Sequence, residues 1–427
     1  MLKIKQINFL GHIINDDNQR QSFYYILLRA GSVISNYILS LFIISNFSKG
    51  VYGIFVYGLS IFMFLSTLLK FGVDVHFVKL FSELRDKVIP LWVRRIEYKV
   101  ILLASFISVI IFTFVQYCDF KVSQNSALLF FIASAPINVA VLLNSGKLRG
   151  VSQISKFAFL NITGRVFFTL LFCFVFLLLF ESTLPLLIYA SHLLSIVLMY
   201  LLSYYWTKKR FTYSTTKPLK LPKKFLSYNR SLMIKSYITI LFLWGDRFFL
   251  SQICKPEEVA EYDITLKIGM IMMIILEALK STYASTFARY FSDVKNLSLH
   301  VRRSTLIGFF TSVLIFIFIV VFGKTLLALF GQEFVSAYPV LVVIAVGYIS
   351  AAFFGQADNV IEMCNLAKRY VNPYFYVVIF SLSLGVFLTY LYGILGMAIG
   401  FSLGNILFQL VASILVRKYI GINTRVV

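Results

Sequence analysis

The sequence has few acidic residues: 18 aspartates and glutamates stand against 40 lysines and arginines in 427 residues. In a soluble chain, the resulting net charge of +22 would favour nucleic-acid binding. Here most basic residues lie between long apolar runs, where the positive-inside rule of membrane proteins accounts for them. We therefore expect a membrane protein that does not bind nucleic acid.

Cysteine and histidine are also scarce, with four residues of each type. The cysteines form no C-x-x-C pair and have no metal-ligand spacing, so we expect no metal and no other bound cofactor. Cys118 and Cys254 fall at predicted outer helix ends, so either a disulfide or two free thiols fits. The chain lacks a G-x-x-x-x-G-K-[ST] phosphate loop and a long outward loop for catalytic residues. We therefore expect neither an ATPase nor any other enzyme.

Apolar residues make up 59% of the chain, and the mean hydropathy is +0.85. Apolar runs of about 20 residues are typical of transmembrane helices. The pattern therefore predicts an all-α polytopic membrane protein with about twelve spans. These spans are 22–45, 51–71, 99–117, 127–146, 156–180, 184–206, 231–253, 262–286, 304–323, 337–357, 373–391 and 394–416.

The distribution of basic residues predicts the orientation of the chain. The outward connections hold only Lys49, Lys121, Lys255 and Lys324, whereas the inward connections hold most of the other lysines and arginines. The positive-inside rule then places both termini in the cytoplasm.

The chain also repeats itself. Lys79–Arg85 (KLFSELR) matches Arg289–Lys295 (RYFSDVK), and Asn144–Lys147 (NSGK) matches Asn365–Lys368 (NLAK). These repeats predict two pseudo-symmetric six-helix lobes, as in transporters built from parallel repeats. The expected divisions are an interfacial or cytoplasmic segment 1–21, an N-lobe 22–206, a basic cytoplasmic linker 207–230, a C-lobe 231–416 and a cytoplasmic tail 417–427.

Six short motifs in this order carry a family resemblance. Their sequences are VYGIF at 51–55, KFGVD at 70–74, WGDR at 244–247, EVAEY at 258–262, FGQEF at 330–334 and YGILGMAI at 392–399. Together they resemble the Wzx-type O-antigen flippases of the MOP exporter superfamily, although Glu261 stands where the family usually has glycine.

The resemblance implies a MATE-like fold that moves undecaprenyl-diphosphate-linked repeat units from the inner to the outer leaflet of the bacterial inner membrane. Membrane lipids and other O-antigen assembly proteins, such as a polymerase and a chain-length regulator, are the partners that it implies.

Four cations inside predicted spans are the candidate substrate ligands. Arg29, Arg165, Arg247 and Lys267 would line a basic cavity, in which a guanidinium can bind a diphosphate through paired hydrogen bonds. For Arg247 the alternative is a structural ion pair with Asp246 or Glu277.

Other charged residues are candidates for ion coupling or for structural ion pairs. Glu277 and Lys280 are three residues apart on one helix face, and Asp358 and Glu362 are four apart. Together with Asp246, these residues are candidates for binding H⁺ or Na⁺ whose movement would be coupled to transport. A MATE-like multidrug or cation exporter and another kind of polysaccharide-export protein are the alternative functions, but a drug-cation exporter needs an acidic cavity.

Overall fold

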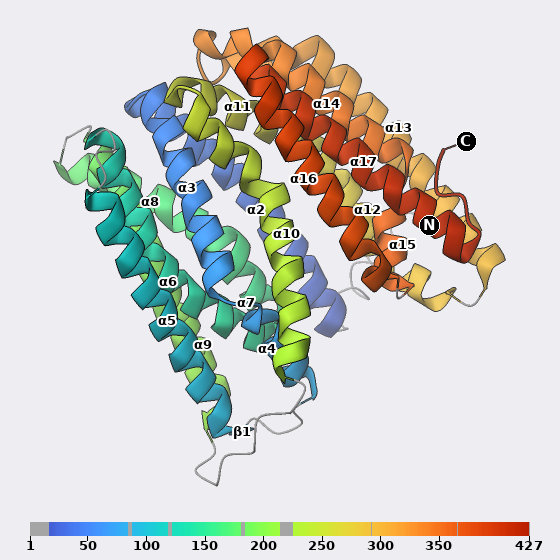
Figure 1. Cartoon of the computed structure of the whole chain (residues 1–427), viewed down its shortest axis with the longest axis horizontal. Helices are drawn as coiled ribbons and strands as arrows, with labels where there is room; N and C mark the ends of the chain where they lie inside the picture. Colours follow the sequence, from blue (N-terminus) through green and yellow to red (C-terminus); the bar gives the residue numbers. More distant parts are fainter. Residues whose placement is uncertain are drawn as a thin grey trace, which may run out of the picture. The chain divides into compact units, whose positions relative to one another are not determined.

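The computed structural model is built almost entirely of α-helices (Figure 1). It describes residues 17–83, 88–117, 122–180, 184–213, 225–291, 293–364 and 366–426. Residues 1–16 of the predicted N-terminal segment, Cys118 and residues 214–224 of the predicted linker lie outside the described residues. The chain divides into two compact units, Met1–Ile240 and Leu241–Val427.

Most of the first unit consists of long helices. Its elements are α2 (Asp17–Asn46), α3 (Lys49–Leu69), α4 (Val73–Glu83), β1 (Val88–Ile89), α5 (Leu91–Tyr117), α6 (Val122–Gly150), α7 (Ile154–Ala158), the π-helix η1 (Phe159–Thr163), α8 (Gly164–Phe180), α9 (Pro185–Arg210), β2 (Thr212–Tyr213) and the first part of α10 (Phe225–Ile253). The two short strands pair in parallel, Val88 with Thr212 and Ile89 with Tyr213.

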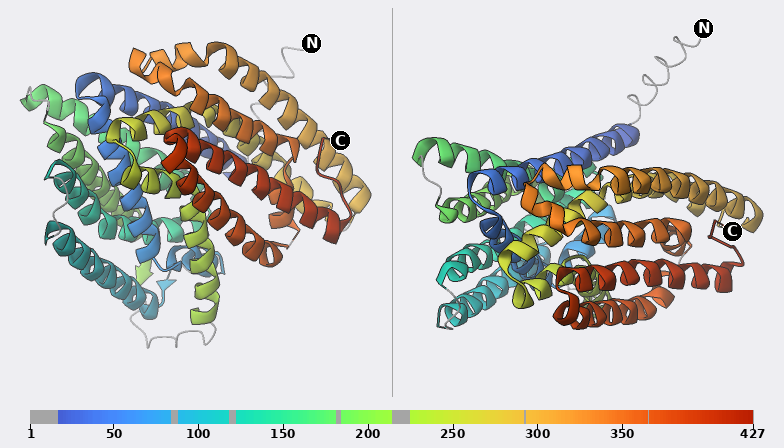
Figure 2. Two further views of the ribbon diagram at one scale, coloured as in Figure 1. Left: turned by 45° about the horizontal axis from the view of Figure 1, so that its top comes forward. Right: turned by 90° about the horizontal axis from the view of Figure 1, so that it is seen from above.

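The second unit contains the rest of α10 and the helices that follow it. These are α11 (Pro256–Gly269), α12 (Ile271–Arg289), α13 (Val294–Ala328), the 3₁₀-helix η2 (Gln332–Ala337), α14 (Tyr338–Phe353), α15 (Ala357–Met363), α16 (Ala367–Tyr392) and α17 (Ile394–Ile420). In every view α16 and α17, at the red end of the colour bar, lie side by side (Figure 2).

Ten helical segments of the described residues are long and apolar enough to cross a membrane. The other two predicted spans correspond to α10 and to the pair α11 and α12. Charged residues lie inside the apolar runs of α10 and α12, and the predicted span 262–286 is broken at Met270, so that α11 has only 14 residues. The all-α polytopic architecture expected from composition is confirmed.

Glycines permit close helix packing at two places. A Cβ atom on Gly146 would lie 2.5 Å from the backbone oxygen of Asp74, so only glycine lets α6 approach α4 this closely. A Cβ atom on Gly400 of α17 would lie 2.4 Å from the Cα of Gly385 on α16. Gly146 belongs to the NSGK motif, so this motif has a packing role.

Aromatic side chains fill the core of the first unit. Phe62 and Phe131 place their ring centroids 4.8 and 4.7 Å from that of His192 on α9. Phe62 is 0% exposed, Phe131 is 0% and His192 is 1%. A buried imidazole among aromatic rings is unusual, because a polar group away from water normally needs a hydrogen-bond partner.

Candidate functional site

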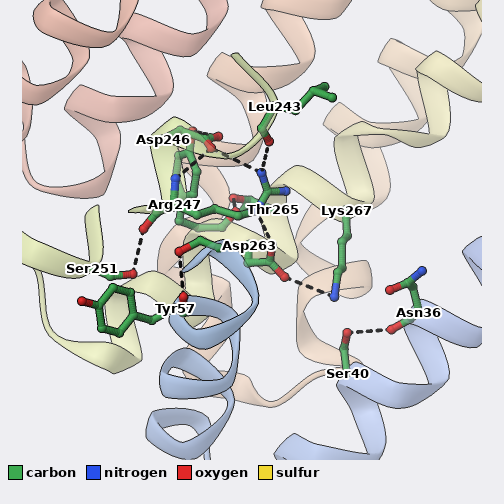
Figure 3. Close-up of polar contacts among 12 residues, drawn as sticks. Asn36, Ser40, Tyr57, Leu243, Asp246, Arg247, Ser251, Asp263, Thr265 and Lys267 are labelled. Atoms are coloured by element: carbon green, nitrogen blue, oxygen red, sulfur yellow. Dashed lines mark hydrogen bonds and ion pairs between the residues drawn. The ribbon is translucent and has the colours of Figure 1, made fainter. Parts of the chain in front are cut away.

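Four charged side chains form a network between α10 and α11 in the second unit (Figure 3). Nε of Arg247 donates to Oδ1 of Asp263 at 2.7 Å, and its Nη1 lies 3.3 Å from Oδ1 of Asp246. Nζ of Lys267 lies 3.1 Å from Oδ2 of Asp263. Two carboxylates therefore balance two cations, and we call these four residues the α10–α11 network.

Neighbouring groups complete the hydrogen bonding of this network. Nη1 of Arg247 donates to the backbone oxygen of Leu243 at 3.1 Å, and the guanidinium carbon lies 4.9 Å from the ring centroid of Trp244. Asp246 accepts the backbone N–H of Arg247 at 2.8 Å and the hydroxyl of Tyr262 at 3.0 Å. Such saturation is what allows charged groups to remain buried.

The network is buried, so the stability of the fold depends on it. Asp246 is 0% exposed, Asp263 is 3% and Arg247 is 8%. The local fold brings the partners together, because Pro256 begins α11 and Glu258 accepts the backbone N–H of Lys255 at 2.9 Å. Removing one partner from a buried pair leaves an uncompensated charge, which costs about 3–5 kcal/mol.

The structure places two of the predicted cavity cations in this network. Arg247 pairs with Asp246, as the alternative interpretation allowed, and more closely with Asp263, which the sequence analysis did not single out. Asp263 and Lys267 are four residues apart on α11, and this i, i+4 spacing is a signal from which their pairing could have been found.

Arg165 has a different environment in the first unit. It lies in the first turn of α8, with its guanidinium carbon 5.5 Å from the ring centroid of Phe62. Its Nη1 is buried and has no hydrogen-bond partner among the described residues, and the same holds for Nε2 of His192. Phe62 contacts both side chains, so Arg165 and His192 flank one aromatic ring.

A π-helical turn positions Arg165. The turn η1 directly precedes α8, and π-turns inside helices are frequent at functional sites. Ser32 of α2 donates its hydroxyl to the backbone oxygen of Ile162 at 3.1 Å, and Thr163 donates to the backbone oxygen of Leu28 at 2.7 Å. These two bonds fix the irregular turn against α2.

Arg29, the remaining predicted cavity cation, also belongs to α2. Its side chain is exposed within the described structure. It lies one residue after Leu28, whose backbone oxygen receives the hydroxyl of Thr163. Arg29 and Arg165 are therefore carried by two elements of the first unit that are joined through η1.

The other predicted charged residues of the second unit lie on α12 and α15, where these two helices contact each other. Nζ of Lys280 lies 2.6 Å from Oδ2 of Asp358, and Asn359 donates to the backbone oxygen of Lys280 at 3.0 Å. Glu277 is half-buried, whereas Glu362 is exposed. Lys280 thus pairs across two helices with Asp358.

Comparisons with known proteins agree with this architecture. The family model described as "Polysaccharide biosynthesis protein" matches residues 20–283, and the model described as "MatE" matches residues 232–391. A search of the curated proteins gives no match.

Solved structures with the same fold are MATE transporters and other transporters of the MOP superfamily. An inward-facing multidrug resistance MATE family transporter of this superfamily has a TM-score of 0.65 and 16% identity, covering 93% of this chain and 94% of its own. An outward-facing conformation of such a transporter has a TM-score of 0.65 and 15% identity, with 96% and 97% covered.

A further similar structure is a MOP superfamily transporter from Pyrococcus furiosus, for which the reverse polarity of the binding pocket suggests a different function. Its TM-score is 0.67 at 16% identity, with 96% of this chain and 97% of that chain covered. These likenesses show a MATE-like fold.

Proposed function

Because this chain belongs to the polysaccharide biosynthesis protein family, within the MOP superfamily of membrane transporters, we propose that it is a lipid-linked oligosaccharide flippase. Its cargo would be undecaprenyl-diphosphate-linked O-antigen or polysaccharide repeat units. These would move from the inner to the outer leaflet of a bacterial inner membrane by alternating access, with both termini in the cytoplasm.

The single observation that carries this proposal is the environment of Arg165. A buried guanidinium N–H without a protein partner costs free energy unless a water, an ion or a ligand completes the bond. A diphosphate supplies the acceptor oxygens that match a planar guanidinium. The unpartnered Nη1 of Arg165 therefore supports an anionic cargo.

The other predicted residues take supporting roles in this proposal. Arg29 is carried by the helix that fixes η1, so we assign it to the same anion-binding function. Arg247 and Lys267 are neutralised by Asp246 and Asp263, so an arriving diphosphate would compete with these carboxylates for them. Protonation of such carboxylates, or Na⁺ binding to them, would release the cations and couple ion movement to transport.

Replacement of Arg165 tests the proposal. Arg165→Ala should lower the export of lipid-linked repeat units in cells at least tenfold, and Arg165→Lys should restore part of it by keeping the charge but not the planar fork. Lys156→Ala, about two turns before Arg165 in the same helical stretch, is the control that should keep export unchanged. Undiminished export by a normally expressed Arg165→Ala protein would contradict the assignment.

A MATE-like multidrug exporter is the second candidate function. The match of the MatE model to residues 232–391, which contain the carboxylates of the α10–α11 network, favours it. A cationic cargo would be repelled by Arg165, so Arg165→Ala should then preserve or raise the export of a cationic dye. Loss of repeat-unit export without any dye export would support the flippase.

A further inference from the structure

A cavity of about 230 Å³ lies within the first unit, in the groove between α5 and α9. The floor is α6, which contributes Ala140, Asn144 and Lys147. One end is closed by Ile89 of β1 and by Phe211, which follows α9 directly. The parallel pairing of β1 with β2 holds these two closing residues near each other.

The floor of the cavity carries a buried ion pair. Lys147 is 1% exposed and forms a salt bridge with Glu97 of α5, which is 8% exposed. Nζ of Lys147 also donates to Oδ1 of Asn144 at 3.2 Å, and Asn144 donates to the hydroxyl of Ser203 on α9 at 3.1 Å. The floor is therefore rigid and electrically neutral.

The rim of the cavity carries two further cations. Arg94 on α5 and Lys208 on α9 both line the cavity and are both exposed. Together with the Lys147–Glu97 pair, they give the lining a net charge of +2. An anion that entered the cavity would meet two cations on opposite walls.

Tyrosines line the cavity beside this rim, and exposed apolar residues follow along α5. Tyr98 and Tyr204 line the cavity and are 54% and 51% exposed. Arg94 lies 5.5 Å from the ring centroid of Tyr98, and Lys208 lies 5.9 Å from that of Tyr204. Further along α5, Leu102 is 67% exposed, so an apolar surface follows the charged one.

Tyrosine and basic residues in this order are typical of the membrane interface, where a lipid head group meets its acyl chains. We propose that this cavity binds the phosphate of an anionic phospholipid. Arg94 and Lys208 bind the phosphate oxygens from the two walls, and the acyl chains lie along the exposed apolar residues of α5. The site lies wholly within the first unit, and the inference does not depend on the transported cargo.

A free phosphate ion has the same acceptor oxygens, but it would leave the exposed apolar residues of α5 without a partner of their own kind. The experiment therefore compares lipid with inorganic phosphate. Thermal unfolding of the purified full-length protein in detergent is measured with added phosphatidylglycerol, phosphatidylcholine or inorganic phosphate. We expect phosphatidylglycerol alone to raise the melting temperature, by several degrees at saturation.

Two double variants decide whether the effect belongs to the cavity. Because a basic residue near an anionic lipid contributes about a fivefold gain in affinity, R94Q/K208Q should weaken phosphatidylglycerol binding about 25-fold. R95Q/K209Q removes the same charge from exposed neighbours that do not line the cavity, and should bind as the wild type does.

Equal weakening by both double variants would overturn the site, since the lipid would then be attracted by general surface charge. An equal shift with inorganic phosphate would overturn the lipid assignment. Melting temperatures without lipid identify any variant that is damaged in folding.

Discussion

Nε of Arg247 donates to Oδ1 of Asp263 at 2.7 Å, across sixteen residues of sequence and from one helix to the next. The sequence analysis singled out Arg247, which stands inside an apolar run. It did not single out Asp263, which stands at the start of the predicted span 262–286. Their pairing turns the most conspicuous cation of the second unit into part of a neutral network.

Removing the negative partner of this pair should destabilise the protein. Asp263→Asn leaves Arg247 and Lys267 short of one carboxylate in a buried site, so the free energy of unfolding should fall by about 3 kcal/mol. Thermal unfolding in detergent measures this loss. Glu257→Gln changes the same charge at an exposed position of α11 and should shift stability by less than about 0.5 kcal/mol. Wild-type stability of Asp263→Asn would contradict the pairing.

The pair of Lys280 and Asp358 should contribute less. Its side chains are 28% and 18% exposed, so solvent screens their attraction. A double-mutant cycle with Lys280→Gln and Asp358→Asn should give a coupling energy of about 1 kcal/mol. Glu257→Gln, at an exposed position of α11, is the control. A coupling energy near zero would mean that the two side chains do not pair in the membrane.

The packing of α4 on α6 makes Gly146 sensitive to the smallest substitution. In Gly146→Ala the new methyl group would meet the backbone oxygen of Asp74, and this overpacking should cost about 1–3 kcal/mol. Gly31→Ala is the matched control, because a Cβ atom at Gly31 in α2 has nothing within 4 Å. Alanine is the better helix former, so this control should gain up to about 1 kcal/mol. Equal effects of the two changes would contradict the close approach.

Cys254, between α10 and α11, should react slowly with thiol reagents. Burial, and secondarily the nearby carboxylate of Glu258, raise the pKa of its thiol from 9.0 to about 11. The thiolate is the nucleophile, so at pH 8 its fraction is about 100 times smaller than for a cysteine of pKa 9.0. Maleimide labelling of a single-cysteine protein should accelerate steadily as the pH rises from 7 to 10. A rate that begins to level off above pH 9 would show an ordinary thiol pKa.

Much of the architecture followed from the sequence, since apolar runs of membrane length predict helices from local composition alone. The charged residues inside two of these runs were also visible, and they lie in α10, α11 and α12. The break at Met270 was missed, because Gly269 directly before it is a single glycine inside an apolar run, which does not by itself end a helix.

The partners of the charged residues were harder to predict. Arg247 and Lys280 drew attention as charged residues inside apolar runs, but Asp263 lies sixteen positions from Arg247 and Asp358 lies 78 positions from Lys280. Apolar periodicity says little about which helices pack together. The same holds for His192, a single histidine in an apolar run, which only the packing of Phe62 and Phe131 marks as unusual.

The sequence by itself determined that this chain crosses a membrane through many helices, because burial of apolar side chains in lipid depends on composition over about 20 residues. Only the tertiary structure decided which cations are neutralised and which retain an unpartnered N–H. That distinction depends on distances between side chains of different helices, and it separates Arg247, bound to Asp263, from Arg165, whose Nη1 has no partner among the residues described.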